Sequence, residues 1–307
     1  MKVSAKEITE QLLNWLWEDY LKRVSYARKY VELVNKKGGN VVNDHIALRT
    51  FNTHTGEQPA GIRALKHILI CLDYYPAAKY DFTKKKLKAA HFEHPDPMFP
   101  KFFVSQLEVE LLPEWAQNIV KKMVKDTPYI LSDRSIELLG LLNREGELPK
   151  MAGEALVTDL VQYFRRPWKI PEKEDVLKLN DVSQYAAWVL LHGNSVNHFT
   201  AFINYQEVSE WPDLETTCEG LKDAGVPMKE QIEGEKGSKL QQSATHAVKE
   251  EVEVKGNDGV ENITWTYAYY ELAQRGYVEE SGNKKLFSGF LEDQAAQLFN
   301  MTRTRDN

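Results

Sequence analysis

The chain repeats one short pattern, and this repeat limits its folds more than any other feature of the sequence. VNDHIALRTF at residues 42–51 and SVNHFTAFIN at residues 195–204 are each predicted to form a strand that carries a histidine. A helix is predicted after each strand, at about 60–74 and 212–224, and further strands follow each helix. Because internal repetition indicates repeated structural units, we predict two related modules that each begin with a histidine-bearing strand.

The remaining segments complete an organisation in four parts. Residues 1–40 are predicted to form an N-terminal helix that starts at a capping box of Ser4 and Glu7. Residues 41–112 form the first module, 113–194 a helical insertion, and 195–307 the second module with the C-terminal segment. The other predicted strands lie near 86–93, 101–110, 239–245, 248–255 and 262–272. We expect the four parts to make one compact α+β unit.

The two repeated histidines, His45 and His198, are the first candidates for a metal site. A lone histidine on a strand is usually a hydrogen-bonded structural residue, and this interpretation stays open. The repeat favours a shared role, because equivalent strands of two modules can meet in one sheet. Two imidazoles in an enclosed space suit a first-row transition metal, and a carboxylate would complete a facial triad with open positions.

Glu271 is the candidate for that carboxylate. It follows Tyr267 and Tyr269 on one face of the predicted strand 262–272. A glutamate on an aromatic face is costly to bury unless it is paired or bound to a cation. The alternative is that Glu271 lies at an exposed strand end and pairs with Arg275.

Arg49 is the candidate for substrate binding and catalysis. It shares a strand face with His45 and lies about 13 Å further along an extended chain. Its planar guanidinium can bind a carboxylate through two parallel hydrogen bonds. A surface arginine on an edge strand is the other interpretation. A second histidine pair, His91 and His94, is spaced for opposite faces of a strand, so we interpret both as near-site or turn residues and not as ligands.

Charge and hydropathy exclude several classes of protein. The 307 residues carry a formal net charge of −6 and have no basic stretch interleaved with aromatic residues, so we expect no nucleic-acid partner. No apolar run approaches the ~20 residues of a membrane span, and the first residues do not resemble a signal peptide. Cys71 and Cys218 are predicted to be buried, reduced thiols, which favours a cytoplasmic protein. The oligomeric state is left open.

The chain resembles a known family in an ordered set of motifs, which are DHIALRTF, YDFTKKKLKAAHFEHPDP, PKFFVSQLE, VNHFT, KLQQSAT and YYELAQRG. They are similar to motifs of the 2-oxoadipate dioxygenase/decarboxylase family, also called hydroxyglutarate synthase. The resemblance runs from about residue 40 to about residue 300. It implies a fold like that of the vicinal-oxygen-chelate proteins, in which two βαβββ modules form a curved mixed sheet around a metal site.

The resemblance also implies a site and a reaction. Fe(II) would be held by His45, His198 and Glu271, with Zn or Mn as substitutes in a purified sample, and Arg49 would bind the substrate. The implied enzyme is a non-haem iron dioxygenase/decarboxylase of lysine catabolism. Its partners would be dioxygen and a 2-oxo acid similar to 2-oxoadipate. Its products would be CO2 and a shortened 2-hydroxy acid similar to 2-hydroxyglutarate.

Other functions stay open at this point. The family has Glu where this chain has Gln106 and Ser where it has Ala244, and the chain is shorter than members with established activity. A metal-dependent hydrolase or isomerase of the same fold is one alternative, and a metal-binding member without oxygenase activity is another. A non-catalytic interaction protein would leave the two histidines and Glu271 without a purpose.

Overall fold

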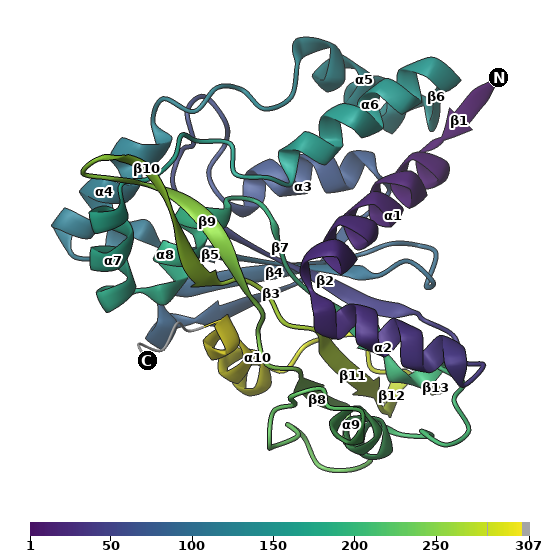
Figure 1. Cartoon of the computed structure of the whole chain (residues 1–307). Helices are drawn as coiled ribbons and strands as arrows, with labels where there is room; N and C mark the ends of the chain where they lie inside the picture. The colour runs from purple at the N-terminus through teal and green to yellow at the C-terminus, as the bar shows by residue number, and fades with distance from the viewer. Residues whose placement is uncertain (281, 303–307) are drawn as a thin grey trace.

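A curled sheet of seven strands lies at the centre of the computed structural model, which describes residues 1–280 and 282–302. Its strands are β2 (Asn43–Phe51), β3 (Tyr75–Phe82), β4 (Leu87–Glu93), β5 (Lys101–Leu107), β7 (Val196–Phe202), β8 (Leu240–Ala244) and β11 (Glu271–Arg275). They lie side by side in the order β3-β4-β5-β2-β7-β11-β8 (Figure 1).

The two histidine strands meet in the middle of this sheet. β2 and β7 are antiparallel, with His45 opposite Thr200 and Ala47 opposite His198. On one side, β5 runs parallel to β2 and is followed by the antiparallel strands β4 and β3. On the other side, β11 runs parallel to β7 and is followed by the antiparallel strand β8. The α+β class and the meeting of the two strands are therefore confirmed.

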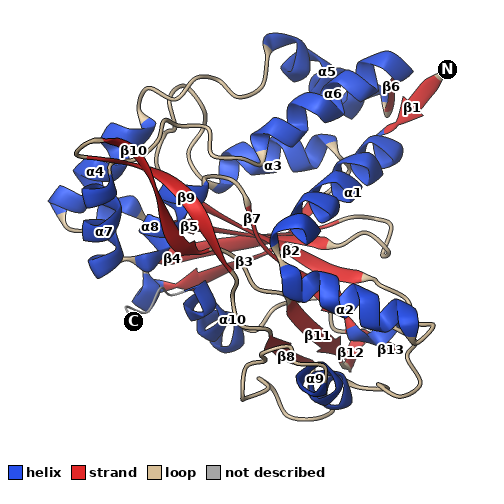
Figure 2. Ribbon diagram, in the orientation of Figure 1, coloured by secondary structure: helices blue, strands red, loops and turns tan. Residues whose placement is uncertain are grey.

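The second half gives the main sheet three strands, which corrects the prediction of a complete βαβββ unit there. β9 (Lys249–Gly256) and β10 (Gly259–Thr266) pair only with each other in a separate two-stranded sheet. Figure 2 shows this hairpin standing apart from the main sheet. In β9 the buried Val252 and Val254 alternate with charged residues, so one face of the hairpin packs on the protein and the other faces water.

Helices surround the sheet, and they are α1 (Ala5–Arg23), α2 (Ser25–Lys36), α3 (Ile62–Cys71), α4 (Glu114–Val124), α5 (Asp133–Glu145), α6 (Lys150–Tyr163), α7 (Lys173–Val182), α8 (Gln184–His192), α9 (Leu214–Asp223) and α10 (Glu292–Leu298). Short 3₁₀ helices are η1 (Thr83–Lys85), η2 (Val109–Leu111), η3 (Ile203–Tyr205) and η4 (Phe299–Thr302). Two further two-stranded antiparallel sheets are formed by β1 (Lys2–Ser4) with β6 (Glu147–Pro149) and by β12 (Tyr277–Glu280) with β13 (Asn283–Leu286).

Most of residues 113–194, the predicted helical insertion, lies in helices. It contains α4 to α8, and Figure 1 shows α4, α7 and α8 grouped at one end of the sheet while α5 and α6 lie on one side of it. The boundaries at residues 40, 112 and 194 stay a prediction. Among the residues described, none of the helices combines the length and apolar character needed to cross a membrane.

The N-terminal helix is broken once, although the sequence predicts a single helix to residue 37. Val24 is fully buried and extended, with φ −107° and ψ 92°, and separates α1 from α2. Arg28 Nη1 donates to the carbonyls of Leu21 and Lys22 at 2.6 and 2.9 Å, which satisfies acceptors that the break leaves free. The capping box of Ser4 and Glu7 is confirmed at the start of α1.

The predicted strand 262–272 is also two separate strands. β10 ends at Thr266 and β11 starts at Glu271, and all four residues between them are buried. Backbone carbonyls in this segment accept from side chains, for example Tyr267 from Trp188 Nε1 at 2.7 Å and Tyr269 from the Tyr20 hydroxyl. Because both sides of the segment face the core, these aromatic residues do not form one alternating face with Glu271.

Candidate metal centre

His45 and His198 lie on adjacent strands and face each other inside the sheet. Their exposed fractions are 2% and 8%, and their ring centroids are 5.6 Å apart. The antiparallel register of β2 and β7 sets this distance, because each histidine is near the other's position across the strand pair. The two histidines are more than 150 residues apart in the sequence, and the pairing of β2 with β7 brings their rings together.

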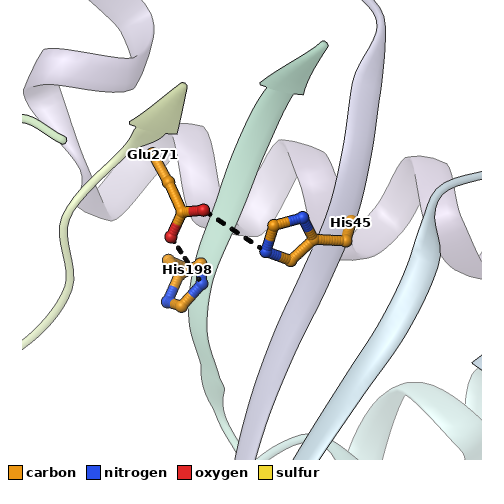
Figure 3. Close-up of side chains that lie close together, drawn as sticks. All are labelled: His45, His198 and Glu271. Carbon is orange, nitrogen blue, oxygen red and sulfur yellow. Dashed lines mark ion pairs between the residues drawn. The ribbon is translucent and has the colours of Figure 1, made fainter. Parts of the chain in front are cut away.

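Glu271 completes the cluster from the first position of β11. Its side chain is fully buried, with Oε1 3.6 Å from His45 Nε2 and Oε2 3.3 Å from His198 Nε2 (Figure 3). One ligand atom from each of the three residues lies within 4.8 Å of the others. The structure therefore brings the three predicted residues together, and their role as metal ligands stays a prediction. The alternative pairing of Glu271 with Arg275 is wrong, because Arg275 binds Asp44.

The ionisation of these side chains fits a metal ion. Burial raises the pKa of Glu271 to about 8, although a hydrogen bond from Gln242 Nε2 opposes the shift. Burial lowers the pKa of His45, and burial together with nearby groups, including the Arg49 charge, lowers the pKa of His198 well below its usual value, which favours the neutral form of both imidazoles. Glu271 Oε2 has no hydrogen-bond partner among the described residues. Two neutral imidazole nitrogens and one carboxylate match the donor set of a facial triad.

A β-bulge next to each histidine helps to fix the orientation of its imidazole ring. Between Asn43 and His45, β2 has one extra residue, Asp44, and β7 has its own extra residue, Asn197, directly before His198. Asp44 Oδ1 lies 2.8 Å from His45 Nδ1, and Asn197 Oδ1 lies 3.0 Å from His198 Nδ1. In a regular strand neighbouring side chains point to opposite faces, so the bulges make these contacts possible. Both rings are thereby held with Nε2 toward Glu271.

The hydrogen-bond partners of the two histidines, Asp44 and Asn197, differ in charge, and the sequence did not lead us to predict this. Asp44 is itself bound by Arg275, whose Nε and Nη2 donate to its carboxylate at 2.6 and 2.8 Å. Burial alone would raise the pKa of Asp44, but the Arg275 charge and hydrogen bonds hold it well below its usual range. His45 is therefore supported by a carboxylate and His198 by a neutral amide. The signal available in the sequence was that a polar residue precedes the histidine in both copies.

Arg49 lies in the same cavity as the three candidate ligands. It is 2% exposed and lines a cavity that also contains His45, His198 and Glu271. Its Nη1 donates to Thr302 Oγ1 at 2.8 Å, and its Nε has no hydrogen-bond partner among the residues that the structure describes. Within the described part of the chain, no carboxylate lies within 4.0 Å of its side-chain nitrogens. Its burial lowers its pKa, since the charged form loses water.

The second histidine pair does not join this cluster. His91 Nδ1 is 2.8 Å from the Tyr80 hydroxyl and its Nε2 is 3.0 Å from Glu93 Oε1. His94 Nδ1 accepts from the backbone of Asp96 at 2.9 Å, in the turn after β4. Neither is part of the His-His-Glu group, as the sequence predicts.

Known proteins are similar to this chain in sequence and in fold. A family model described as 2-oxoadipate dioxygenase/decarboxylase matches residues 11–306. The chain belongs to that family. The resemblance seen in the sequence is thus confirmed. A family relative from Oryza sativa subsp. japonica, the chloroplastic/amyloplastic 2-oxoadipate dioxygenase/decarboxylase, is 27% identical over 243 residues, which cover 74% of this chain and 59% of that protein.

Solved structures show the same fold in relatives of the family. A protein from Ralstonia eutropha JMP134, described as belonging to the glyoxalase superfamily, has a TM-score of 0.84 and 27% identity over 94% of this chain and 87% of its own. The hydroxyglutarate synthase from Oryza sativa, solved in complex with 2-oxoadipate, has a TM-score of 0.75 and 24% identity over 97% and 93%. The name of the rice relative places that protein in plastids, and a cytoplasmic location for this chain stays a prediction.

Proposed function

We propose that this protein is an Fe(II)-dependent dioxygenase/decarboxylase that converts a 2-oxo acid with a second carboxylate into CO2 and a shortened 2-hydroxy acid. The observation that supports this most strongly is the position of Arg49 in the cavity of the His-His-Glu cluster, with no carboxylate partner among residues 1–280 and 282–302. One molecule each of dioxygen and 2-oxo acid balance the products, so no external reductant is needed.

Arg49 would bind the carboxylate far from the reacting carbon. A buried guanidinium without a counter-ion is costly, and an anionic ligand would offset that cost. Its planar donors match a carboxylate through two parallel hydrogen bonds. The indole of Trp188 and the phenol ring of Tyr185 lie 5.2 and 5.0 Å from Arg49 Cζ, and both rings attract the guanidinium charge. The guanidinium donors of Arg49 would therefore already be in place when the substrate carboxylate binds.

His45, His198 and Glu271 would hold the metal ion. Fe(II), when bound, would supply the one-electron chemistry by which dioxygen reacts. The protein's own share is to fix the three ligands, through Asp44 and Asn197 for the two histidines, and to exclude water from the cavity. The bound 2-oxoadipate of the rice relative makes 2-oxoadipate the first substrate to test.

The test combines metal content with oxygen consumption. Protein purified without chelator is analysed for bound metal, reconstituted with Fe(II), and offered a panel of 2-oxo acids with and without a second carboxylate. We expect oxygen uptake and CO2 release with dicarboxylic members such as 2-oxoadipate. His45→Ala should lose the metal, whereas His67→Ala, at an exposed histidine of α3, should retain it.

Two results would contradict the proposal. An iron-loaded protein that consumes no oxygen with any acid of the panel would be a metal-binding member without this activity. A protein active only with Zn or Mn, without oxygen, would be a hydrolase or isomerase.

A further inference from the structure

The cavity at the metal centre is too small for the substrate proposed above. Its volume is about 30 Å³. Sites for small organic ligands usually measure roughly 300–1,000 Å³. A six-carbon dicarboxylic acid therefore needs a part of the wall to move.

The C-terminal segment closes this cavity. Phe290, Ala295 and Phe299 contribute to its wall, and Phe299 is the first residue of η4. The same short helix occupies the donors of Arg49, because Nη1 donates to Thr302 Oγ1 at 2.8 Å and Nη2 to the Phe299 carbonyl at 3.3 Å. η4 thus takes the place that a substrate carboxylate would have at Arg49.

A larger cavity lies on the other side of Phe299. Its volume is about 270 Å³, and Phe299 contributes to the walls of both cavities. Three consecutive lysines, Lys84 to Lys86, line it, and Asp181 is the one acidic residue among its described lining residues. Burial and, after it, the charge of Arg49 lower the pKa of Lys85.

We propose that the lysine-lined cavity is the vestibule through which an anionic 2-oxo acid reaches Arg49, and that η4 is the gate between the two cavities. This inference rests on the proposed function. Displacing Phe299 would join the two spaces, and the lysines would attract a dianion toward the opening.

The bonds that hold the gate are of the kind that a carboxylate can replace. η4 offers Arg49 a neutral carbonyl and a neutral hydroxyl, and Gln184 Nε2 donates to the same Phe299 carbonyl at 2.9 Å. Arg49 is charged, so its bonds to η4 already have one charged partner. A carboxylate adds the opposite charge and can bind the planar guanidinium through two parallel hydrogen bonds. The acid would therefore displace η4 from Arg49 and keep it displaced while bound.

The gate is tested by hydrogen exchange on full-length, Zn(II)-loaded protein, in which binding occurs without turnover. Titration calorimetry first measures the affinity for 2-oxoadipate. Exchange is then followed in the peptide that spans α10 and η4, residues 292–302, with and without the acid. We expect faster exchange in this peptide when the acid is bound, and no change in a control peptide from α6.

Thr302→Val separates the gate from the binding site itself. It removes the hydrogen bond to Arg49 and keeps the side-chain shape, so closing becomes less favourable and 2-oxoadipate should bind about fivefold more tightly. Thr158→Val, which removes a hydroxyl bonded to the Glu154 carbonyl on α6, is the matched control and should leave the affinity unchanged.

The vestibule is tested by charge removal. Lys84→Gln with Lys85→Gln should slow the association of 2-oxoadipate about fivefold at low salt, and the difference should vanish near 1 M salt. Association is followed by tryptophan fluorescence, since Trp188 lies 5.2 Å from Arg49 Cζ. The control, Lys22→Gln with Lys66→Gln, neutralises two exposed lysines on α1 and α3 and should have no effect.

The outcomes separate the two proposals. If the wild-type protein does not bind 2-oxoadipate, the proposed function and the vestibule both fail. If it binds the acid but the exchange of residues 292–302 and the affinity of Thr302→Val are unchanged, the gate alone is wrong. If both lysine pairs have equal effects, the vestibule is wrong.

Discussion

Asp44 and Arg275 form a two-point ion pair directly behind His45, with donor–acceptor distances of 2.6 and 2.8 Å. Both side chains are buried, and the remaining Arg275 donor, Nη1, binds the carbonyls of Phe287 and Gly289 at 2.9 and 2.8 Å. The pair therefore fixes one candidate ligand and ties β2 and β11 to the segment that follows β13.

Breaking this pair should destabilise the protein and weaken metal binding. Asp44→Asn keeps the size of the side chain but leaves the Arg275 charge buried and unpaired, which costs about 3–5 kcal/mol of unfolding free energy. Metal affinity should fall roughly 10–100-fold, because His45 loses its charged support. Urea unfolding and competition with a chelator measure the two effects. The double variant Asp44→Asn with Arg275→Met should recover part of the stability; if it does not, the buried charge is not the cause.

Replacing Asn197 should lower the metal affinity more than it lowers the stability of the fold. Asn197→Ala removes the acceptor for His198 Nδ1, which frees the ring to turn. Metal affinity should fall about tenfold, whereas the loss of one neutral hydrogen bond should cost only about 1 kcal/mol of unfolding free energy. The same two measurements apply. An unchanged metal affinity would show that the bulge holds His198 without the amide.

Substitutions of Arg49 and of His45 should have different effects on turnover and on metal content. Arg49→Lys keeps the charge but not the planar fork, so KM for a dicarboxylic 2-oxo acid should rise roughly 10–100-fold with metal content unchanged. Arg49→Ala should abolish turnover with iron still bound, and His45→Ala should lose the iron itself. Metal analysis and oxygen consumption on the three variants check this. Normal turnover by Arg49→Ala would exclude it as the carboxylate-binding residue.

Metal binding should release a proton near neutral pH. The raised pKa of Glu271, about 8 because of burial, keeps its carboxyl protonated in the metal-free protein at pH 7, whereas a metal needs the carboxylate. Affinity should therefore rise with pH by up to about tenfold per unit below pH 8 and level off above it. The lowered pKa values of His45 and His198 mean that neither adds a proton. Calorimetry in buffers of different ionisation enthalpy counts the protons, and zero released at pH 7 would contradict the assignment.

The sequence was sufficient to predict which residues meet, because the repeat places His45 and His198 in equivalent strands and the family motifs add Glu271 from a later strand. It was not sufficient to predict how they are held. Asp44 and Asn197 reach the neighbouring rings only because a bulge occurs at each of them, and a bulge has no signature in the side-chain alternation of these strands.

Errors in the fold prediction have a similar origin. The predicted strand 262–272 was built on aromatic alternation, but hydrogen bonds from Trp188 and Tyr20 replace the strand ladder around Tyr267 and Tyr269. Those partners are far away in sequence. The contact of Arg49 with η4 is equally long-range, since 253 residues separate it from Thr302.

The most direct test of the central claim is the fate of labelled oxygen. Fe(II)-loaded protein is given 2-oxoadipate under ¹⁸O₂, and the 2-hydroxy acid is analysed by mass spectrometry with the reaction in ordinary water. The account predicts that both atoms of dioxygen enter the product, one in the new carboxylate and one in the hydroxyl group, with one CO2 released per dioxygen consumed. A product without label, or iron-loaded protein that leaves both oxygen and 2-oxoadipate unconsumed, would contradict it.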